Sequence, residues 1–351
     1  GGPEVPGYTD LNTCFWYGPY GGGDTRNNIA LPDVYVTYWA ADLQDFPIGA
    51  SVVLDGEFSY GRHNSLNLYN TDGEPTESIL DTEMVPEPGS TNPFRPGADR
   101  LAEDRRFRMW LVNDSSAPDP VPPEAEGIPA ENTLLTGGDE RVTVLWRVYV
   151  PDDGLNALGG VDLPEPTVIL PDGTTLTGED ACRYNPDITT LSSAAPPLGW
   201  YTLSLSRKHN IGDYSGPAWE RSFSTDATAE CSYGLLPDDW PEGQDPCDRR
   251  NLSPDDPLYT VDRGQEYSTQ SNAYIYKAIN TDYGDVVVIQ GRMPVTPETS
   301  EGVSRMPEDY DLRYWSLCTN EGLATGSVQD CLFDEDVPLD DEREFTIVVS
   351  S

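Results

Sequence analysis

Apolar and polar residues alternate over short stretches of the chain, which is the two-residue period of β-strands. In the segment 34–39 both sets of alternate positions carry large side chains, and this predicts a strand that is covered on both faces. The same kind of pattern predicts further strands at 51–54, 65–69, 106–112, 274–278, 286–289, 313–318 and 345–349. We therefore expect an all-β fold.

The segment 141–150 has the strongest strand pattern in the chain, because it is dense in β-branched and aromatic residues. We expect it to be a central strand. Two short strands at 167–170 and 174–177 flank a Pro-Asp-Gly sequence at 171–173. Proline presets φ and glycine supplies a positive φ, so this stretch predicts a hairpin.

Proline and glycine, with 32 residues each, interrupt the chain too often for long helices. Long Pro/Gly-rich loops are expected, among them 86–100, while the Pro- and Ala-rich stretch 117–129 is typical of a linker and places a boundary near residue 125. The predicted organisation has four parts: an N-terminal arm at 1–30, a first β unit at 31–125, linking β hairpins with a disulfide-held excursion at 126–265, and a second β unit at 266–351.

Several short motifs occur twice along the chain in the same order. They are Val-Val-Leu-Asp-Gly at 52–56 against Val-Val-Ile-Gln-Gly at 287–291, Arg-x-x-Ser-Leu at 62–66 and 313–317, and 80–86 against 332–338, with a Phe-containing strand after each series. Short strands of similar composition can look alike by chance, but the preserved order favours an internal duplication. The predicted fold is two similar antiparallel units, each a β-sandwich or a jelly roll.

The chain is strongly acidic, with 61 acidic against 21 basic residues and a formal charge of −40. Nucleic-acid binding is excluded on this ground, because it needs clustered Arg and Lys to displace counterions. Such a surface favours solubility in salt, multivalent cations or cationic partners. No apolar run approaches the roughly 20 residues that span a bilayer, so no membrane span is expected.

Six cysteines occur without a Cys-x-x-Cys pair, and only His63 and His209 could supplement them as metal ligands. Zinc, haem and iron–sulfur sites are therefore not expected, and three disulfides in an oxidising compartment are the simpler interpretation. Six cysteines allow 15 connectivities. Among these we favour Cys318–Cys331, Cys231–Cys247 and Cys14–Cys182.

Three segments resemble parts of secreted bacterial proteins in families of unknown function. They are Phe-Ser-Tyr-Gly-Arg at 58–62, Asn-Pro-Phe-Arg-Pro-Gly-Ala at 92–98 and Arg-Tyr-Trp-Ser-Leu-Cys at 313–318. The resemblance spans most of residues 30–350. It implies export and β structure, and it implies no activity.

No catalytic residue is predicted, because neither histidine lies in a recognisable nucleophile motif, and no cofactor is required. A glycosidase needs only two carboxylates, and 61 candidates make their spacing in sequence uninformative. Arginines of the repeated motif and aromatic residues beside acids are candidates for ligand binding; they are Arg62, Arg313, Trp315 and Trp240. A place in the buried core is the alternative for the aromatic ones.

Acidic residues crowd the segment near residue 335, where oxygen ligands could hold calcium. The candidate ligands are Asp334, Glu335, Asp336, Asp340 and Asp341. The spacing is not that of an EF-hand, and a merely solvated acidic cluster is the alternative.

Taken together, these features predict a secreted or cell-surface, non-enzymatic protein. It would be a structural or self-assembling subunit of the filament or surface-layer type, or an adhesion module, with copies of itself or another extracellular molecule as partner. The alternative is an extracellular carbohydrate-binding or carbohydrate-active protein that uses paired carboxylates and has glycans as partners.

Overall fold

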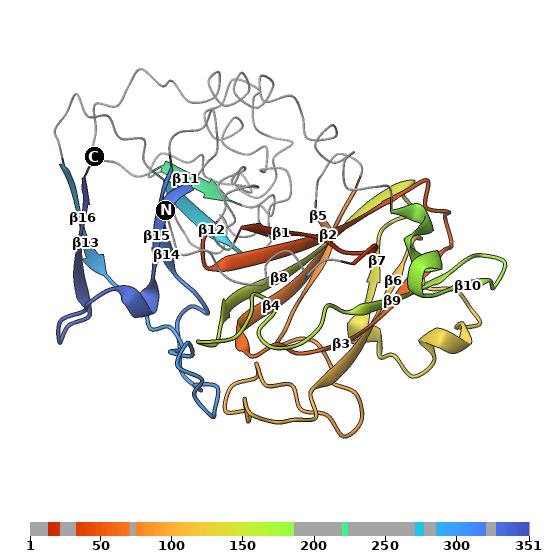
Figure 1. Ribbon diagram of the computed structural model, residues 1–351, viewed down its shortest axis with the longest axis horizontal. Helices are drawn as coiled ribbons and strands as arrows, with labels where there is room; N and C mark the ends of the chain where they lie inside the picture. The colour runs from red at the N-terminus through yellow and green to blue at the C-terminus, as the bar shows by residue number, and fades with distance from the viewer. Residues whose placement is uncertain are drawn as a thin grey trace, which may run out of the picture.

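The computed structural model describes residues 13–21, 33–70, 75–185, 220–223, 271–276, 286–320 and 328–350 (Figure 1). Strands dominate this part of the chain, so the all-β expectation is confirmed. Most of the predicted N-terminal arm and of the segment 186–265, which includes the predicted disulfide-held excursion, lies outside the described residues, as do Trp240, His209, Cys231 and Cys247.

A first sheet has five strands in the order β1-β2-β8-β4-β5. Their bounds are Tyr17–Gly21 for β1, Val36–Gln44 for β2, Arg141–Pro151 for β8, Gly61–Tyr69 for β4 and Pro75–Leu80 for β5. All neighbours are antiparallel, and β8 pairs with β2 on one edge and β4 on the other. The central position predicted for 141–150 is confirmed.

A second five-stranded sheet has the order β10-β9-β3-β6-β7. Its strands are Thr175–Leu176 for β10, Glu165–Ile169 for β9, Ser51–Glu57 for β3, Arg106–Val112 for β6 and Thr133–Leu135 for β7. The predicted hairpin joins β9 to β10, where the Leu170 amide donates to the Thr174 carbonyl at 2.9 Å. Gly173 has a φ of +83°, as this turn requires.

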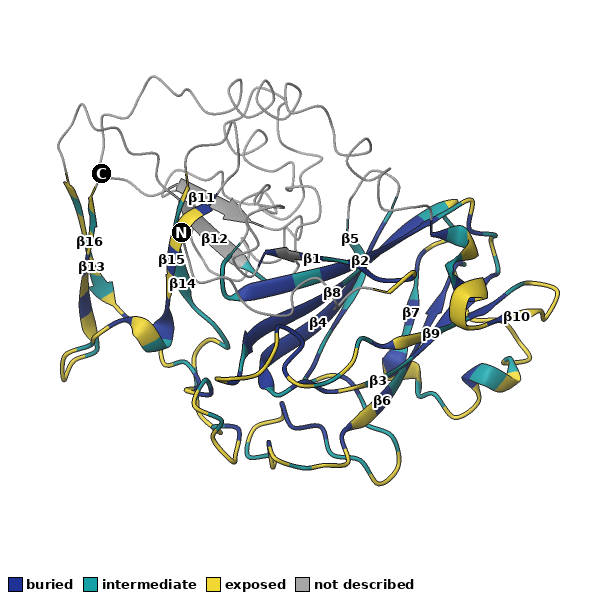
Figure 2. Cartoon of the chain, in the orientation of Figure 1, coloured by how far each residue is buried: buried dark blue, intermediate teal, exposed yellow. Residues whose placement is uncertain are grey.

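One apolar core draws side chains from both sheets, and we call the two sheets together the N-terminal body. Trp39 and Trp146 come from the first sheet, and Leu54 and Phe107 come from the second. The rings of Phe107 and Trp146 stack with centroids 5.7 Å apart. Most residues in the strands of both sheets are accordingly buried (Figure 2).

The predicted boundary near residue 125 falls inside this body, which corrects the assignment of 126–185 to a linking segment. Strands β7 to β10 lie in this range and belong to the two sheets. The proline-rich stretch carries two short 3-10 helices, η3 (Pro123–Ala125) and η4 (Ala130–Asn132). Ala125 of η3 packs with Val53 and Trp110 on the outer face of β3 and β6. A segment whose composition is typical of a linker therefore covers one face of a sheet here.

The remaining described strands form three antiparallel pairs. They are β11 (Glu220–Phe223) with β12 (Ala273–Tyr276), β13 (Val286–Arg292) with β16 (Glu344–Ser350), and β14 (Ser316–Asn320) with β15 (Val328–Phe333), which a 3-10 helix, η9 (Asp334–Asp336), follows. We call the pairs β13–β16 and β14–β15 the C-terminal hairpins. A small core of its own lies between them and includes Phe345, Ile347 and Leu317.

Two disulfides lie in the described residues, Cys14–Cys182 and Cys318–Cys331. Both were among the three predicted bridges, and these two are confirmed. The first joins the start of the chain to η5 (Gly178–Tyr184), and the second joins β14 to β15. They indicate an oxidising compartment. No helix in the described ranges is long and apolar enough to cross a membrane.

The same local contact occurs in the N-terminal body and in the C-terminal hairpins. Gly56 of β3 lies opposite Phe107 of β6, and Gly291 of β13 lies opposite Phe345 of β16. A Cβ at Gly56 would lie 2.7 Å from the Phe107 ring, and one at Gly291 would lie 2.9 Å from the Phe345 ring. Only glycine therefore lets the phenylalanine ring lie across the neighbouring strand in each pair.

Candidate functional site

Arg62, a predicted ligand-binding residue, lies on β4 where the N-terminal body meets η9. Its guanidinium is fully buried and contacts the carboxylates of Asp334 and Glu335. Its Nε donates to the Thr299 hydroxyl at 3.1 Å. A buried cation requires such partners, because water is not available to solvate it. The arginine is thus committed to contacts within the chain.

Arg313, the equivalent arginine of the second Arg-x-x-Ser-Leu motif, reaches in the opposite direction. Its Nη2 donates to Asp81 Oδ2 at 3.2 Å, and its guanidinium also donates to the backbone oxygens of Arg62 and Phe94. Each motif therefore supplies an arginine to an aspartate of the other segment. We call Arg62, Asp334, Arg313 and Asp81 the arginine joint.

Asp81 is the most enclosed acid of the joint, with no exposed surface. Its Oδ2 also accepts the Asn64 amide at 2.6 Å and lies 2.9 Å from His63 Nδ1. Burial favours the neutral acid, but Arg313 and His63 outweigh this effect and hold the pKa of Asp81 below its ordinary value. Asp81 is therefore a buried charge that its neighbours stabilise.

Asp334 and Glu335 share the single charge of Arg62, and their pKa values move in opposite directions. Burial raises the pKa of Asp334 even though Arg62 opposes the shift. Burial also acts to raise the pKa of Glu335, but hydrogen bonds from Ser300 and Thr299 outweigh it and hold that pKa below its ordinary value. Glu335 is thus the better stabilised carboxylate of the two.

The five predicted calcium ligands do not converge on one point. The carboxylates of Asp334 and Glu335 form ion pairs with Arg62. Asp336 accepts a hydrogen bond from the Tyr35 hydroxyl at 2.8 Å. Asp340 is exposed and accepts the amides of Glu342 and Glu344, and its neighbour Asp341 is exposed as well. Calcium binding stays a prediction.

One group of potential metal ligands occurs within the described ranges. It consists of Asp33, Cys318 and Cys331. Because the two sulfurs are joined to each other, they are not thiolates that could bind a metal. Asp33 instead accepts hydrogen bonds from the hydroxyls of Tyr314, at 2.7 Å, and Ser316, at 2.6 Å.

Trp315, the third predicted ligand-binding residue, is half-buried in the small core of the C-terminal hairpins. Its ring centroid lies 5.6 Å from that of Phe345, and its amide donates to Asp334 Oδ2 at 2.9 Å. Among the candidates in the described ranges, the structure thus brings Arg62, Arg313, Asp334, Glu335 and Trp315 together. They form an internal contact between two parts of the fold.

The β13–β16 hairpin carries a surface that the sequence analysis did not single out. Val288 lies directly opposite Val348, and these side chains are 56% and 59% exposed, while Val286 on the same face is 56% exposed. We call Val286, Val288 and Val348 the valine face. The opposite face of the hairpin packs into the small core through Ile289 and Ile347. The outer face therefore carries an exposed apolar cluster at one end and polar residues, among them Gln290, Arg292 and Thr346, at the other.

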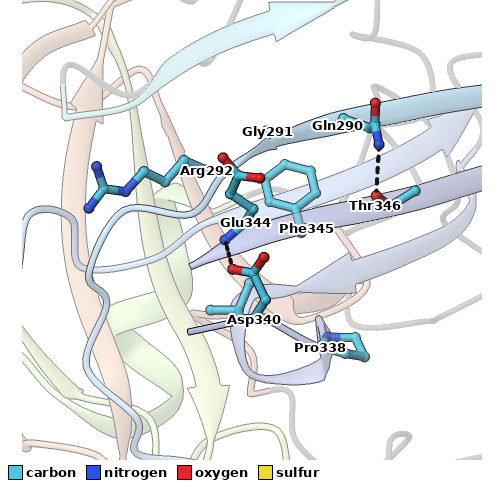
Figure 3. A pocket seen from close by; sticks show the side chains of 9 residues that line it. Gln290, Gly291, Arg292, Pro338, Asp340, Glu344, Phe345 and Thr346 are labelled. Carbon is cyan, nitrogen blue, oxygen red and sulfur yellow. Dashed lines mark hydrogen bonds between the residues drawn. The ribbon is translucent and has the colours of Figure 1, made fainter. Parts of the chain in front are cut away.

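A hollow of about 650 Å³ lies at the Arg292 end of the β13–β16 hairpin (Figure 3). Its lining residues are Gln290, Gly291, Arg292, Pro338, Leu339, Asp340, Glu344, Phe345 and Thr346. The side-chain amide of Gln290 donates to the Thr346 hydroxyl at 3.2 Å, and the Asp340 carboxylate accepts a hydrogen bond from the backbone amide of Glu344 at 2.8 Å. These polar groups bond to each other across the wall, and they do not form a convergent set of ligand contacts.

Comparison with known proteins gives structural neighbours without a known activity. No protein-family model matches the chain, and no curated protein matches it. An uncharacterised protein from Burkholderia cenocepacia is similar with a TM-score of 0.46 and 11% identity, over 98% of this chain and 73% of that one. A protein from Vibrio parahaemolyticus has a TM-score of 0.25 and 15% identity, over 40% of this chain and 32% of that one. The resemblance to secreted bacterial families stays a prediction.

Proposed function

We propose that this chain is a secreted or cell-surface structural subunit that acts by self-association and carries out no catalysis. The observation that carries the proposal is the valine face on a chain of net charge −40. Isolated exposed apolar residues are common, but a cluster on one hairpin face is typical of an interaction surface. The many acidic groups elsewhere keep copies apart, so contacts concentrate where acids are few.

The arginine joint supports the view of a rigid subunit. It places buried ion pairs between the N-terminal body and the C-terminal hairpins. Arg62 and Arg313, which the sequence motifs made candidates for ligand binding, are engaged in these internal pairs. The two disulfides further restrict the chain. A body that is held internally in this way is suited to keeping its shape within an assembly.

Local contacts also support an internal duplication of a β-sandwich unit. The Phe58 amide donates to the Arg105 carbonyl at 2.9 Å, and the Met293 amide donates to the Arg343 carbonyl at the same distance. The Asn64 amide donates to Asp81 Oδ2, and the Asp81 amide donates to the Asn64 carbonyl. In the same way, the Trp315 amide donates to Asp334 Oδ2, and the Asp334 amide donates to the Trp315 carbonyl. Together with the paired glycines, these contacts support the proposal that β3 to β6 and β13 to β16 are two copies of one unit.

Sedimentation velocity and negative-stain imaging of the native protein test the proposed function. We expect association that grows with protein concentration and with salt, since salt screens the repulsion between acidic copies. A monomer at every concentration up to about 100 µM, in low and in high salt, would contradict the proposal. Binding of discrete glycans on an array by such a monomer would favour the carbohydrate alternative.

A further inference from the structure

We infer that the open edge of β13 pairs antiparallel with β13 of a second copy, so that the two hairpins form one four-stranded sheet in the order β16-β13-β13′-β16′. The inference rests on the proposed self-association and specifies its contact. Within the described ranges, β13 hydrogen-bonds to β16 alone. An unpaired strand edge presents amide and carbonyl groups that another strand can satisfy.

The corresponding strand of the N-terminal body shows how such an edge is filled. Strand β3 carries the same Val-Val-aliphatic-x-Gly sequence as β13, and it pairs with β6 on one edge and with β9 on the other. On its outer face, Val53 packs with Trp110, Ile169 and Ala125. The residue equivalent to Val53 is Val288, which is 56% exposed. Among the residues that the structure describes, β13 thus has neither the second neighbour nor the cover that β3 has.

The charges on the two strands differ in a way that favours a copy of β13 as the partner. Strand β3 carries Asp55 and Glu57, whereas the equivalent residues of β13 are Gln290 and Arg292. The edge of β13 therefore carries no acid on a chain with 61 of them. It also lacks the proline or lysine with which natural edge strands block pairing.

An antiparallel pair places the valine faces of the two copies side by side. The two-fold axis that relates the copies keeps their outer faces on one side of the sheet, so the valine faces of the two copies join.

The expected contact is small. Seven residues at about 3.4 Å each give an edge of roughly 24 Å. A contact along one strand edge of this length buries less surface than the roughly 800 Å² per partner of a standard interface. The dimer should therefore be weak, and it should form more readily at high salt.

Sedimentation velocity of the full chain over a concentration series tests the pairing with one substitution and its matched control. Val288→Lys introduces a charge on the edge strand and leaves the inner face unchanged. Its matched control is Ile48→Lys, because Ile48 is 59% exposed and lies in the N-terminal body outside the hairpin. We expect Val288→Lys to weaken dimerisation at least about tenfold while Ile48→Lys leaves it unchanged, with the same circular dichroism and melting temperature as the native protein.

The outcomes separate this inference from the proposed function. If the native protein associates and Val288→Lys associates equally well, the β13 pairing is wrong while self-association stands. If the native protein never associates, both are wrong. Loss of dimer in Val288→Lys with retained folding supports the pairing.

Discussion

Arg313 donates a hydrogen bond to Asp81 at 3.2 Å, across 232 positions of the chain. Arg62 makes the reciprocal contact with Asp334, across 272 positions. Both arginines occupy the same place in an Arg-x-x-Ser-Leu motif, and both aspartates accept the amide of the residue that precedes the serine of their own motif. The two parts of the fold are therefore joined by an exchange of equivalent side chains.

Loss of the Arg62 guanidinium should destabilise the protein strongly. Arg62→Met would leave the buried carboxylate of Asp334 and that of Glu335 without their cation, and removing one partner of a buried pair typically costs about 3–5 kcal/mol. Urea unfolding measures the change. Arg106→Met is the matched control, since its pair with Glu87 at 3.6 Å is exposed and should contribute at most about 1 kcal/mol. Equal losses would contradict a special role for Arg62.

Acid should destabilise the protein through Asp81 of the arginine joint and through Glu335, which also pairs with Arg62. Their pKa values are lower in the folded protein, so the folded state binds fewer protons and unfolding takes up protons as the pH falls. The stability they supply is present above the ordinary carboxyl pKa of about 4 and is lost as the pH falls through the folded values. The raised pKa of Asp334 has the opposite sign, because its neutral form is favoured in the folded state.

Melting temperatures between about pH 2 and pH 7 test this expectation. Asp81→Asn should give a shallower acid limb than the native protein. Asp341→Asn should not, because Asp341 is exposed and outside the joint. An unchanged acid limb in Asp81→Asn would show that other carboxyls govern acid unfolding.

Each of the two glycines below a phenylalanine ring should resist substitution. Gly291→Ala places a Cβ 2.9 Å from the Phe345 ring, and Gly56→Ala places one 2.7 Å from the Phe107 ring, so we expect each change to cost about 1–3 kcal/mol. Val288→Ala serves as a control in the same strand as Gly291, since Val288 faces solvent and its truncation should cost little. Chemical denaturation compares the three. A neutral Gly291→Ala would remove one support for the duplication.

The Cys318–Cys331 bridge should stabilise the C-terminal hairpins. It closes a loop with a sequence separation of 13, for which a chain-entropy model gives about 3 kcal/mol. A Cys318→Ser, Cys331→Ser double variant should therefore melt at a lower temperature than the native protein. Added reductant should lower the melting temperature of the native protein further than that of the variant, because the variant has already lost one bridge.

Much of the N-terminal body can be predicted from local sequence. The segment 141–150 is apolar on both faces because β8 is buried at the centre of a sheet, and Pro-Asp-Gly at 171–173 forms the turn that its backbone preferences favour. The stretch 117–129 misled the prediction, because a proline-rich segment has the same composition whether it links two units or covers a sheet. Burial of Ala125 depends on tertiary contacts that composition does not reveal.

The candidate site could be predicted only in part. The repeated motifs identified Arg62 and Arg313, but the acids that they contact lie more than 200 positions away, and 61 acids offer too many partners for sequence to choose among. The valine face was missed because Val-Val-Val-Ile reads as a fully buried strand. A run of apolar residues such as Val286 to Ile289 can belong to a core or to an interface, and only the exposure of Val288 distinguishes the two.

Differential scanning calorimetry of the native protein tests most directly the claim that the arginine joint unites the N-terminal body and the C-terminal hairpins. The account predicts a single unfolding transition whose calorimetric and van't Hoff enthalpies agree, because neither part can unfold without exposing the buried ion pairs of the other. The same account predicts that Arg62→Met separates this transition into two. Two well-separated transitions in the native protein would contradict it.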